Sequence, residues 1–191
     1  MDLVPEDAVF VVFEGTDNSE GVRLPAVVES ELLTITTPWQ VKFQENRGAP
    51  ASATFDKLAS YTESSDTGIK YFSGTATYTN TFEINKNILK QGGQIILDLG
   101  SVKNLAEVYV NGQSMGTVWK KPFALDITEA VKAGKNEVEI KVVNLWVNRL
   151  IGDAQPDVKE KLTYTSMPFY NANSPLLPSG LLGPVKLINR K

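Results

Sequence analysis

The sequence contains no histidine and no cysteine among its 191 residues. Without histidine, the chain lacks the commonest general base, the Ser/His catalytic arrangement and most zinc sites. Without cysteine, it has no disulfide, no catalytic thiol and no zinc finger of the cysteine type. These absences exclude several of the commonest catalytic and metal-binding classes.

The sequence also lacks an excess of positive charge and a long apolar run. The formal net charge is −3 and the pI is about 5.1, which argues against a nucleic-acid partner, since phosphate binding needs a basic surface. The apolar run at 8–13 is too short to span a bilayer, and no basic segment with a long apolar stretch marks a signal peptide. We therefore expect no membrane span here. Because the chain begins almost directly with an apolar strand pattern, we expect it to be a piece of a larger protein.

What remains is the composition of one soluble globular domain, with 42% hydrophobic and 21% charged residues. The dominant hydrophobic period is two, which is typical of strands. We expect strands within 8–13, 25–38, 39–44, 74–84, 92–102, 106–119, 122–127, 136–142 and 180–190. Asn111-Gly112 predicts a hairpin turn, and 126–134 predicts one short helix. The polar stretch 45–68 is expected to be a loop with, at most, one helical turn.

This series of short strands with polar turns predicts an all-β protein, either an antiparallel sandwich or a barrel. Long connections between the strands favour a jelly roll over an up-and-down barrel.

The order of several sequence motifs resembles a known module. It is the galactose-binding-like, sugar-binding jelly roll of glycoside hydrolase family 2, and the similarity rests on "WQVKF" at 39, "GIKYFSGTATYTNTF" at 68, "LDLG" at 97, "VYVNG" at 108, "PFALDIT" at 122, "NEVEIKVVN" at 136 and "LGPV" at 182. Three stretches are more specifically similar to the C-terminal part of large bacterial proteins resembling family 106 α-L-rhamnosidases. They are "GIKYFSGTATY", "NLWVNRLIGD" and "SGLLGPV".

The resemblance implies a galactose-binding-like jelly-roll β-sandwich at 37–191, preceded at 1–36 by a β segment that ends another domain. It implies an accessory domain rather than the active site, because none of the matched motifs supplies the paired acidic residues of a glycosidase. The expected partners are the catalytic domain of the same polypeptide and carbohydrate. The resemblance also implies a periplasmic or extracellular location.

The stretch "VNLWVNRLIGD" at 143–153 carries the first candidate carbohydrate contacts, Trp146, Asn148 and Arg149. An aromatic ring can stack on the apolar face of a sugar while Asn and Arg bond its hydroxyl groups. The alternative is a packed strand end, in which Trp146 fills the sandwich and Arg149 bonds Asp153. We expect Trp146 to be mostly structural, and Asn148 and Arg149 to be the surface contacts.

Further candidates lie in two other segments. Trp119 follows the predicted hairpin, and the proline-punctuated segment 164–180 offers Tyr164, Tyr170 and Asn171. Aromatic side chains in this segment can form a wall for a sugar or a flap that docks on another domain.

Other chemistry has weaker support in the sequence. The 22 acidic residues allow many pairs to be drawn, but none is marked as a catalytic pair. We predict no cofactor and no metal-binding residue. Structural calcium stays open, because jelly rolls often hold it by oxygen ligands, and "GTDNSEG" at 15–21 and the Asp98 turn offer oxygens without an EF-hand pattern. An autonomous carbohydrate-binding module is the main rival function, and a self-sufficient hydrolase is a third.

Overall fold

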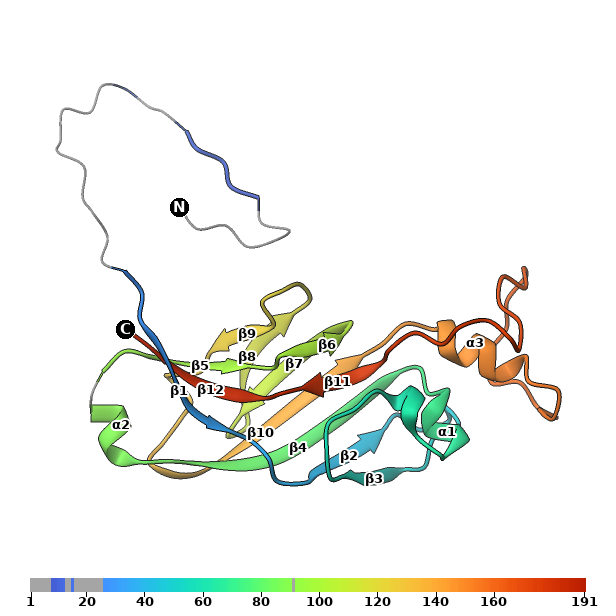
Figure 1. Cartoon of the computed structure of the whole chain (residues 1–191), viewed down its shortest axis with the longest axis horizontal. Coiled ribbons are helices and arrows are strands. Elements are labelled where there is room, and N and C mark those ends of the chain that lie inside the picture. The colour runs from blue at the N-terminus through green and yellow to red at the C-terminus, as the bar shows by residue number, and fades with distance from the viewer. Residues whose placement is uncertain (1–7, 13–14, 16–25, 91) are drawn as a thin grey trace.

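The computed structural model describes residues 8–12, 15, 26–90 and 92–191. It is a galactose-binding-like jelly-roll β-sandwich with short helices at its ends (Figure 1). The strands are β1 (Glu29–Thr34), β2 (Trp39–Phe43), β3 (Ser52–Phe55), β4 (Thr75–Ile84), β5 (Gln94–Asp98), β6 (Ser101–Lys103), β7 (Leu105–Val110), β8 (Gln113–Val118), β9 (Ala124–Asp126), β10 (Gly134–Val143), β11 (Gly180–Gly183) and β12 (Lys186–Arg190). The helices are η1 (Tyr61–Glu63), α1 (Thr67–Lys70), α2 (Lys86–Lys90) and α3 (Val147–Asp153).

The strands form two main sheets. One has four strands in the order β1-β12-β5-β9, and the other has six in the order β3-β2-β4-β10-β7-β8. A separate two-stranded ladder joins β11 to β6. All pairs between named strands are antiparallel, and most neighbours in a sheet are not consecutive in sequence, as in a jelly roll.

Alternating side chains build the core between the sheets. In β10, Asn136, Val138, Ile140 and Val142 are buried, while the residues between them are exposed or half-buried. Because successive strand residues point to opposite faces, this period of two gives one apolar face to each sheet. The strands predicted at 39–44 and 74–84 are confirmed as β2 and β4, and buried residues alternate with more exposed ones along most of each strand.

An aromatic cluster fills the core near β2 and β4. The ring centroid of Phe43 lies 4.9 Å from that of Phe72 and 5.8 Å from that of Tyr61. The Tyr61 and Tyr78 rings stack at 6.4 Å. The Tyr78 hydroxyl donates to the Tyr61 hydroxyl at 2.7 Å and accepts the Leu181 N–H at 3.1 Å, so the two polar tips have partners although both rings are about 1% exposed or less.

The first and last described strands pair at one edge. Glu29 lies opposite Arg190 in the β1–β12 ladder, and the Val28 N–H donates to the Lys191 carbonyl at 2.8 Å. Strand β1 therefore belongs to the four-stranded sheet. The division of the chain into 1–36 and 37–191 stays a prediction.

The hairpin predicted at Asn111-Gly112 is confirmed. Asn111 has φ of 51° and Gly112 has φ of 80°, the left-handed conformation that this turn requires. The turn joins β7 to β8.

Other local predictions were wrong. Residues 8–12 lie in no strand and are exposed, and Phe13 lies outside the described residues. The polar stretch 45–68 contains the unexpected strand β3, which pairs with β2 at a sheet edge, and the predicted last strand is split into β11 and β12.

The helix predicted at 126–134 is only a turn. Asp126 accepts the Thr128 N–H at 2.9 Å, as a cap would. The turn does not continue because the buried Asn136 side chain accepts the Lys132 N–H and donates to the Lys132 carbonyl, both at 2.8 Å. Among the described residues, no helix is long and apolar enough to cross a membrane.

Candidate functional site

The candidate site lies at the end of the sandwich that carries α3. The long segment 154–179 follows α3 there, and α1 lies at the same end, opposite to α2 (Figure 1). This end gathers three of the sequence-predicted carbohydrate contacts beside two clefts.

The segment 72–74 fixes the start of α3. Strand β10 ends at Val143, and the buried Asn144 side chain donates to the Phe72 carbonyl at 2.8 Å and accepts the Gly74 N–H at 2.9 Å. Trp146 occupies the cap position without any side-chain cap bond. The Ser73 hydroxyl instead accepts the Arg149 N–H in the first turn at 3.3 Å, so a distant serine replaces the usual local cap.

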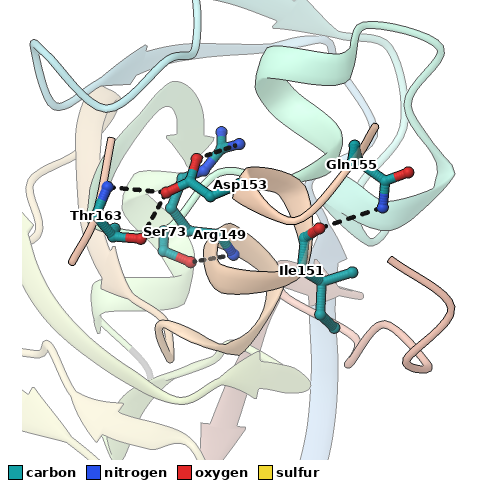
Figure 2. A network of polar contacts seen from close by, with 6 residues as sticks. All are labelled: Ser73, Arg149, Ile151, Asp153, Gln155 and Thr163. Atoms are coloured by element: carbon teal, nitrogen blue, oxygen red, sulfur yellow. Dashed lines mark hydrogen bonds and ion pairs between the residues drawn. The ribbon is translucent and has the colours of Figure 1, made fainter. Parts of the chain in front are cut away.

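A buried ion pair within α3 shares its carboxylate with the segment after the helix (Figure 2). Arg149 Nη2 lies 3.0 Å from Asp153 Oδ1, and both side chains are less than 10% exposed. Asp153 Oδ2 accepts the Thr163 N–H at 2.8 Å and the Thr163 hydroxyl. The Gln155 amide donates to the Ile151 carbonyl at 3.2 Å and to the Ala172 carbonyl at 3.1 Å. These bonds fix the course of a segment that has no strand or helix before Gly180.

A helix glycine allows this ion pair to form. A Cβ atom on Gly152 would lie 2.5 Å from Arg149 Nη2 and 2.6 Å from Tyr71 Cβ. Any larger residue at 152 would push the guanidinium away from Asp153. The space beside α3 is thus filled by the arginine side chain.

The expected surface role of Asn148 and Arg149 was wrong. Asn148 is 2% exposed and Arg149 is 6% exposed. The Asn148 amide donates to the Leu177 carbonyl at 2.7 Å and its oxygen accepts the Leu177 N–H at 2.9 Å, so it ties 154–179 back to the helix. The strand end expected at 143–153 is in fact the helix α3, whose turns direct these polar groups inward.

Trp146, which was expected to be mostly structural, does not fill the sandwich, because 44% of its surface is exposed. The Arg47 guanidinium carbon lies 4.8 Å from the centroid of the Trp146 ring. Both residues line a cleft of about 460 Å³ together with Leu150, Leu162, Thr163, Tyr164 and Thr165.

A second cleft of about 320 Å³ adjoins the first. The two clefts share Leu150, Thr163, Tyr164 and Thr165, and the second adds Lys161, Phe169 and Tyr170 among its walls. Tyr164 is 91% exposed and Tyr170 is 37% exposed. The structure therefore brings the predicted Trp146, Tyr164 and Tyr170 to one end of the molecule, where apolar rings alternate with hydroxyl and cationic groups. Such a lining can bind a polyhydroxylated ring.

A family model described as glycosyl hydrolases family 2, sugar binding domain, matches residues 14–165. The chain belongs to this family. It is the sugar-binding part of such hydrolases and not their catalytic domain.

The sugar-binding domain is similar to segments of much longer proteins. It is 48% identical to a segment of a rhamnosidase from Novosphingobium sp. PP1Y, with a TM-score of 0.84, over 89% of this chain and 16% of that one. It is 39% identical to a protein of Formosa agariphila that carries the provisional name beta-glucuronidase, over 89% of this chain and 17% of that protein. The chain thus spans about a sixth of the length of these two relatives.

A more distant likeness shows the shared fold alone. The β-glucuronidase of Lactobacillus rhamnosus is 22% identical with a TM-score of 0.58, over 88% of this chain and 29% of that one. The β-glucuronidase of Ruminococcus gnavus is 18% identical with a TM-score of 0.60, over 88% of this chain and 30% of that one.

Two predicted contacts of the sugar-binding domain lie apart from the clefts. Trp119 is 71% exposed and follows β8, and it lines neither cleft. Asn171 sits in a local turn, where its N–H donates to the Ser174 hydroxyl at 3.0 Å and its side chain accepts the Asn173 N–H at 2.9 Å. Carbohydrate contact by these two residues stays a prediction.

Sequence reasoning missed Arg47 and Lys161, which bring positive charge to the clefts. Arg47 lies 99 positions from Trp146 in a stretch expected to be a plain loop, so no spacing could connect them.

No group of three acidic residues that could hold a metal ion occurs among the described residues. Of the suggested calcium ligands, 16–21 lie outside the described residues, and Asp98 accepts the Gly100 N–H at 2.8 Å.

Proposed function

We propose that this domain is a non-catalytic accessory domain of an α-L-rhamnosidase-like glycoside hydrolase. It supports the catalytic domain of the same polypeptide, shapes the substrate cleft and contacts glycan. The observation that carries this proposal is the 48% identity to a segment that makes up only 16% of the Novosphingobium rhamnosidase. A periplasmic or extracellular location forms part of the proposal, because the same family resemblance implies it.

The surface of the α3 end supports a docking role. Large apolar side chains are exposed there on the segment after α3 and just before it, namely Leu145, Trp146, Leu162, Tyr164, Met167, Phe169, Tyr170 and Leu177. A monomeric domain rarely exposes so many large apolar groups in one region, and such a region marks an interface. The polar bonds of Asn148 and Asp153 hold the segment in shape before any partner binds. The partner would therefore meet a preformed surface.

The test is a comparison within the full-length polypeptide. We would replace both Phe169 and Tyr170 with Ser and measure turnover of p-nitrophenyl α-L-rhamnoside and p-nitrophenyl β-D-glucuronide, together with thermal unfolding. Trp119→Ser is the matched control, because it removes an exposed aromatic away from the clefts. We expect rhamnosidase turnover that falls, and a lower unfolding temperature, only in the double variant. Unchanged turnover and unfolding would exclude docking, and glucuronide turnover without rhamnoside turnover would exclude the rhamnosidase assignment.

The alternative is an autonomous carbohydrate-binding module. The two clefts lined by Trp146, Tyr164 and Tyr170 favour it. Such a module would bind glycans as the isolated chain, and full-length turnover would stay unchanged on small soluble substrates when the clefts are altered.

A further inference from the structure

The charge around the two clefts points to the class of ligand. Arg47 is half-buried, and its guanidinium lies over the Trp146 ring without an ion pair or side-chain hydrogen bond among the described residues. Its guanidinium carries five N–H donors in a planar fork that matches a carboxylate or a sulfate. Stacking on Trp146 holds this fork in place, so the arginine would lose little side-chain freedom when a ligand binds.

A second cation lies on the wall of the adjoining cleft. Lys161 is exposed, and no ion pair of its ammonium group occurs among the described residues. It lies two residues before Thr163, whose position is fixed by Asp153. The two cations therefore belong to one continuous surface that shares Leu150, Thr163, Tyr164 and Thr165.

The acidic groups near the clefts do not cancel this charge. Asp153 is the only acidic residue that lines either cleft within the described part of the chain. Its two oxygens are already engaged, one by Arg149 and the other by Thr163. The unpaired charges among the residues that line the clefts, those of Arg47 and Lys161, are therefore both positive, although the whole chain has a net charge of −3.

From this arrangement we propose that the joined clefts bind an acidic saccharide. The sugar ring packs on the exposed part of Trp146 and on Tyr164, and the carboxylate or sulfate accepts hydrogen bonds from Arg47. Lys161 adds long-range attraction for the same charge. This inference rests on the glycan contact in the proposed function and names the class of saccharide that the same site would take.

The test is a titration of the 191-residue chain with three ligands, in which binding is measured by ¹H–¹⁵N NMR and by calorimetry. The ligands are methyl β-D-glucuronide, methyl β-D-glucoside 6-sulfate and the neutral methyl β-D-glucoside. We expect at least one acidic glycoside to bind about tenfold more tightly than the neutral one, with affinity that falls as salt is added. The resonances that shift should be those of Arg47, Trp146 and Tyr164. The two acidic ligands together show whether the site takes a carboxylate or a sulfate.

Variants make the test specific. Arg47→Gln should reduce affinity for the acidic glycoside to that for the neutral one, whereas Lys86→Gln, a change on the exposed face of α2, should leave both unchanged. Trp146→Ala should weaken binding of every ligand. Spectra with dispersed amide signals show that each variant is folded.

The inference is overturned by equal affinity for acidic and neutral glycosides, by acidic binding that survives Arg47→Gln, or by no shift with any ligand. None of these results bears on docking, since the docking test measures turnover and unfolding of the full-length polypeptide with Phe169 and Tyr170 changed.

Discussion

Two regions of this domain use aromatic side chains in opposite ways. In the core, Phe72 and Tyr78 are fully buried and lie against other rings. At the α3 end, Tyr164 and Phe169 are 91% and 75% exposed. The core is held together by apolar burial, whereas the α3 end is held by a few polar bonds beneath its rings. The first arrangement provides stability, and the second keeps aromatic groups exposed for a partner or ligand at the expense of that stability.

The largest difference between the two regions is expected when one aromatic ring in each is truncated and the free energy of unfolding is compared. Phe72→Ala should lower the free energy of unfolding by about 3–5 kcal/mol, because it removes a fully buried ring and leaves a cavity. Phe169→Ala should change it by about 0.5 kcal/mol or less, since surface changes usually have small effects. Urea unfolding of both variants measures the difference. Equal losses would show that the exposed segment contributes to the core.

The buried ion pair tests how the α3 end is held. Asp153→Ala leaves the Arg149 guanidinium buried without its partner and releases Thr163, so we expect a loss of about 3 kcal/mol or more. Adding Arg149→Met should restore part of it. Glu139→Gln is the control, because its pair with Lys141 is partly exposed and should contribute about 0–1 kcal/mol. Similar values for Asp153→Ala and Glu139→Gln would contradict the assigned role of the buried pair.

Within the core, Tyr78→Phe isolates a polar bond from apolar packing. The ring stays, but the Leu181 N–H and the Tyr61 hydroxyl lose their partner. Leaving a buried donor unpaired costs about 1–3 kcal/mol, so the loss should be smaller than that of Phe72→Ala. Thermal unfolding with far-UV circular dichroism measures it. A loss as large as that of Phe72→Ala would mean that ring packing was disturbed too.

The smallest expected effect is on the pH dependence of stability. Burial raises the pKa of both Tyr61 and Tyr78 above the usual value for tyrosine. Since the folded state holds these protons more tightly, the resulting stability is fully present below about pH 10, the pKa of an unfolded tyrosine, and is lost as the pH rises above it. We expect unfolding temperature to fall above about pH 10, and replacing both tyrosines with Phe should reduce the slope.

The sandwich could be predicted from sequence wherever burial alternates locally. Val138, Ile140 and Val142 carry the period of two in β10, and Asn111-Gly112 specifies the turn between β7 and β8 by backbone conformation alone. The sequence motifs also led correctly to the family. Strand β3 escaped prediction because an edge strand of four residues, alternately exposed and half-buried, has little apolar signal.

The α3 end could not be predicted in the same way. Its helix has no local capping side chain, since the capping hydroxyl comes from Ser73, 76 positions before Arg149. Asn148 and Arg149 appeared to be surface groups because polar residues are usually exposed. Arg149 is instead buried against Asp153 in the same helix, the pairing named in the alternative interpretation of this stretch, whereas Asn148 is buried against Leu177, 29 positions along the chain. Arg47 reaches Trp146 through the same kind of distant contact. Local sequence carries no record of such pairs.

The ladder between β1 and β12 has a consequence for assembly. Because Glu29 and Arg190 are neighbours across two strands, the polypeptide enters and leaves the sandwich side by side. A unit with adjoining entry and exit can be inserted into a longer protein without forcing the flanking parts away from each other. The opposite end of the unit, with α3 and the two clefts, would then point away from the insertion point and could contact a neighbouring domain.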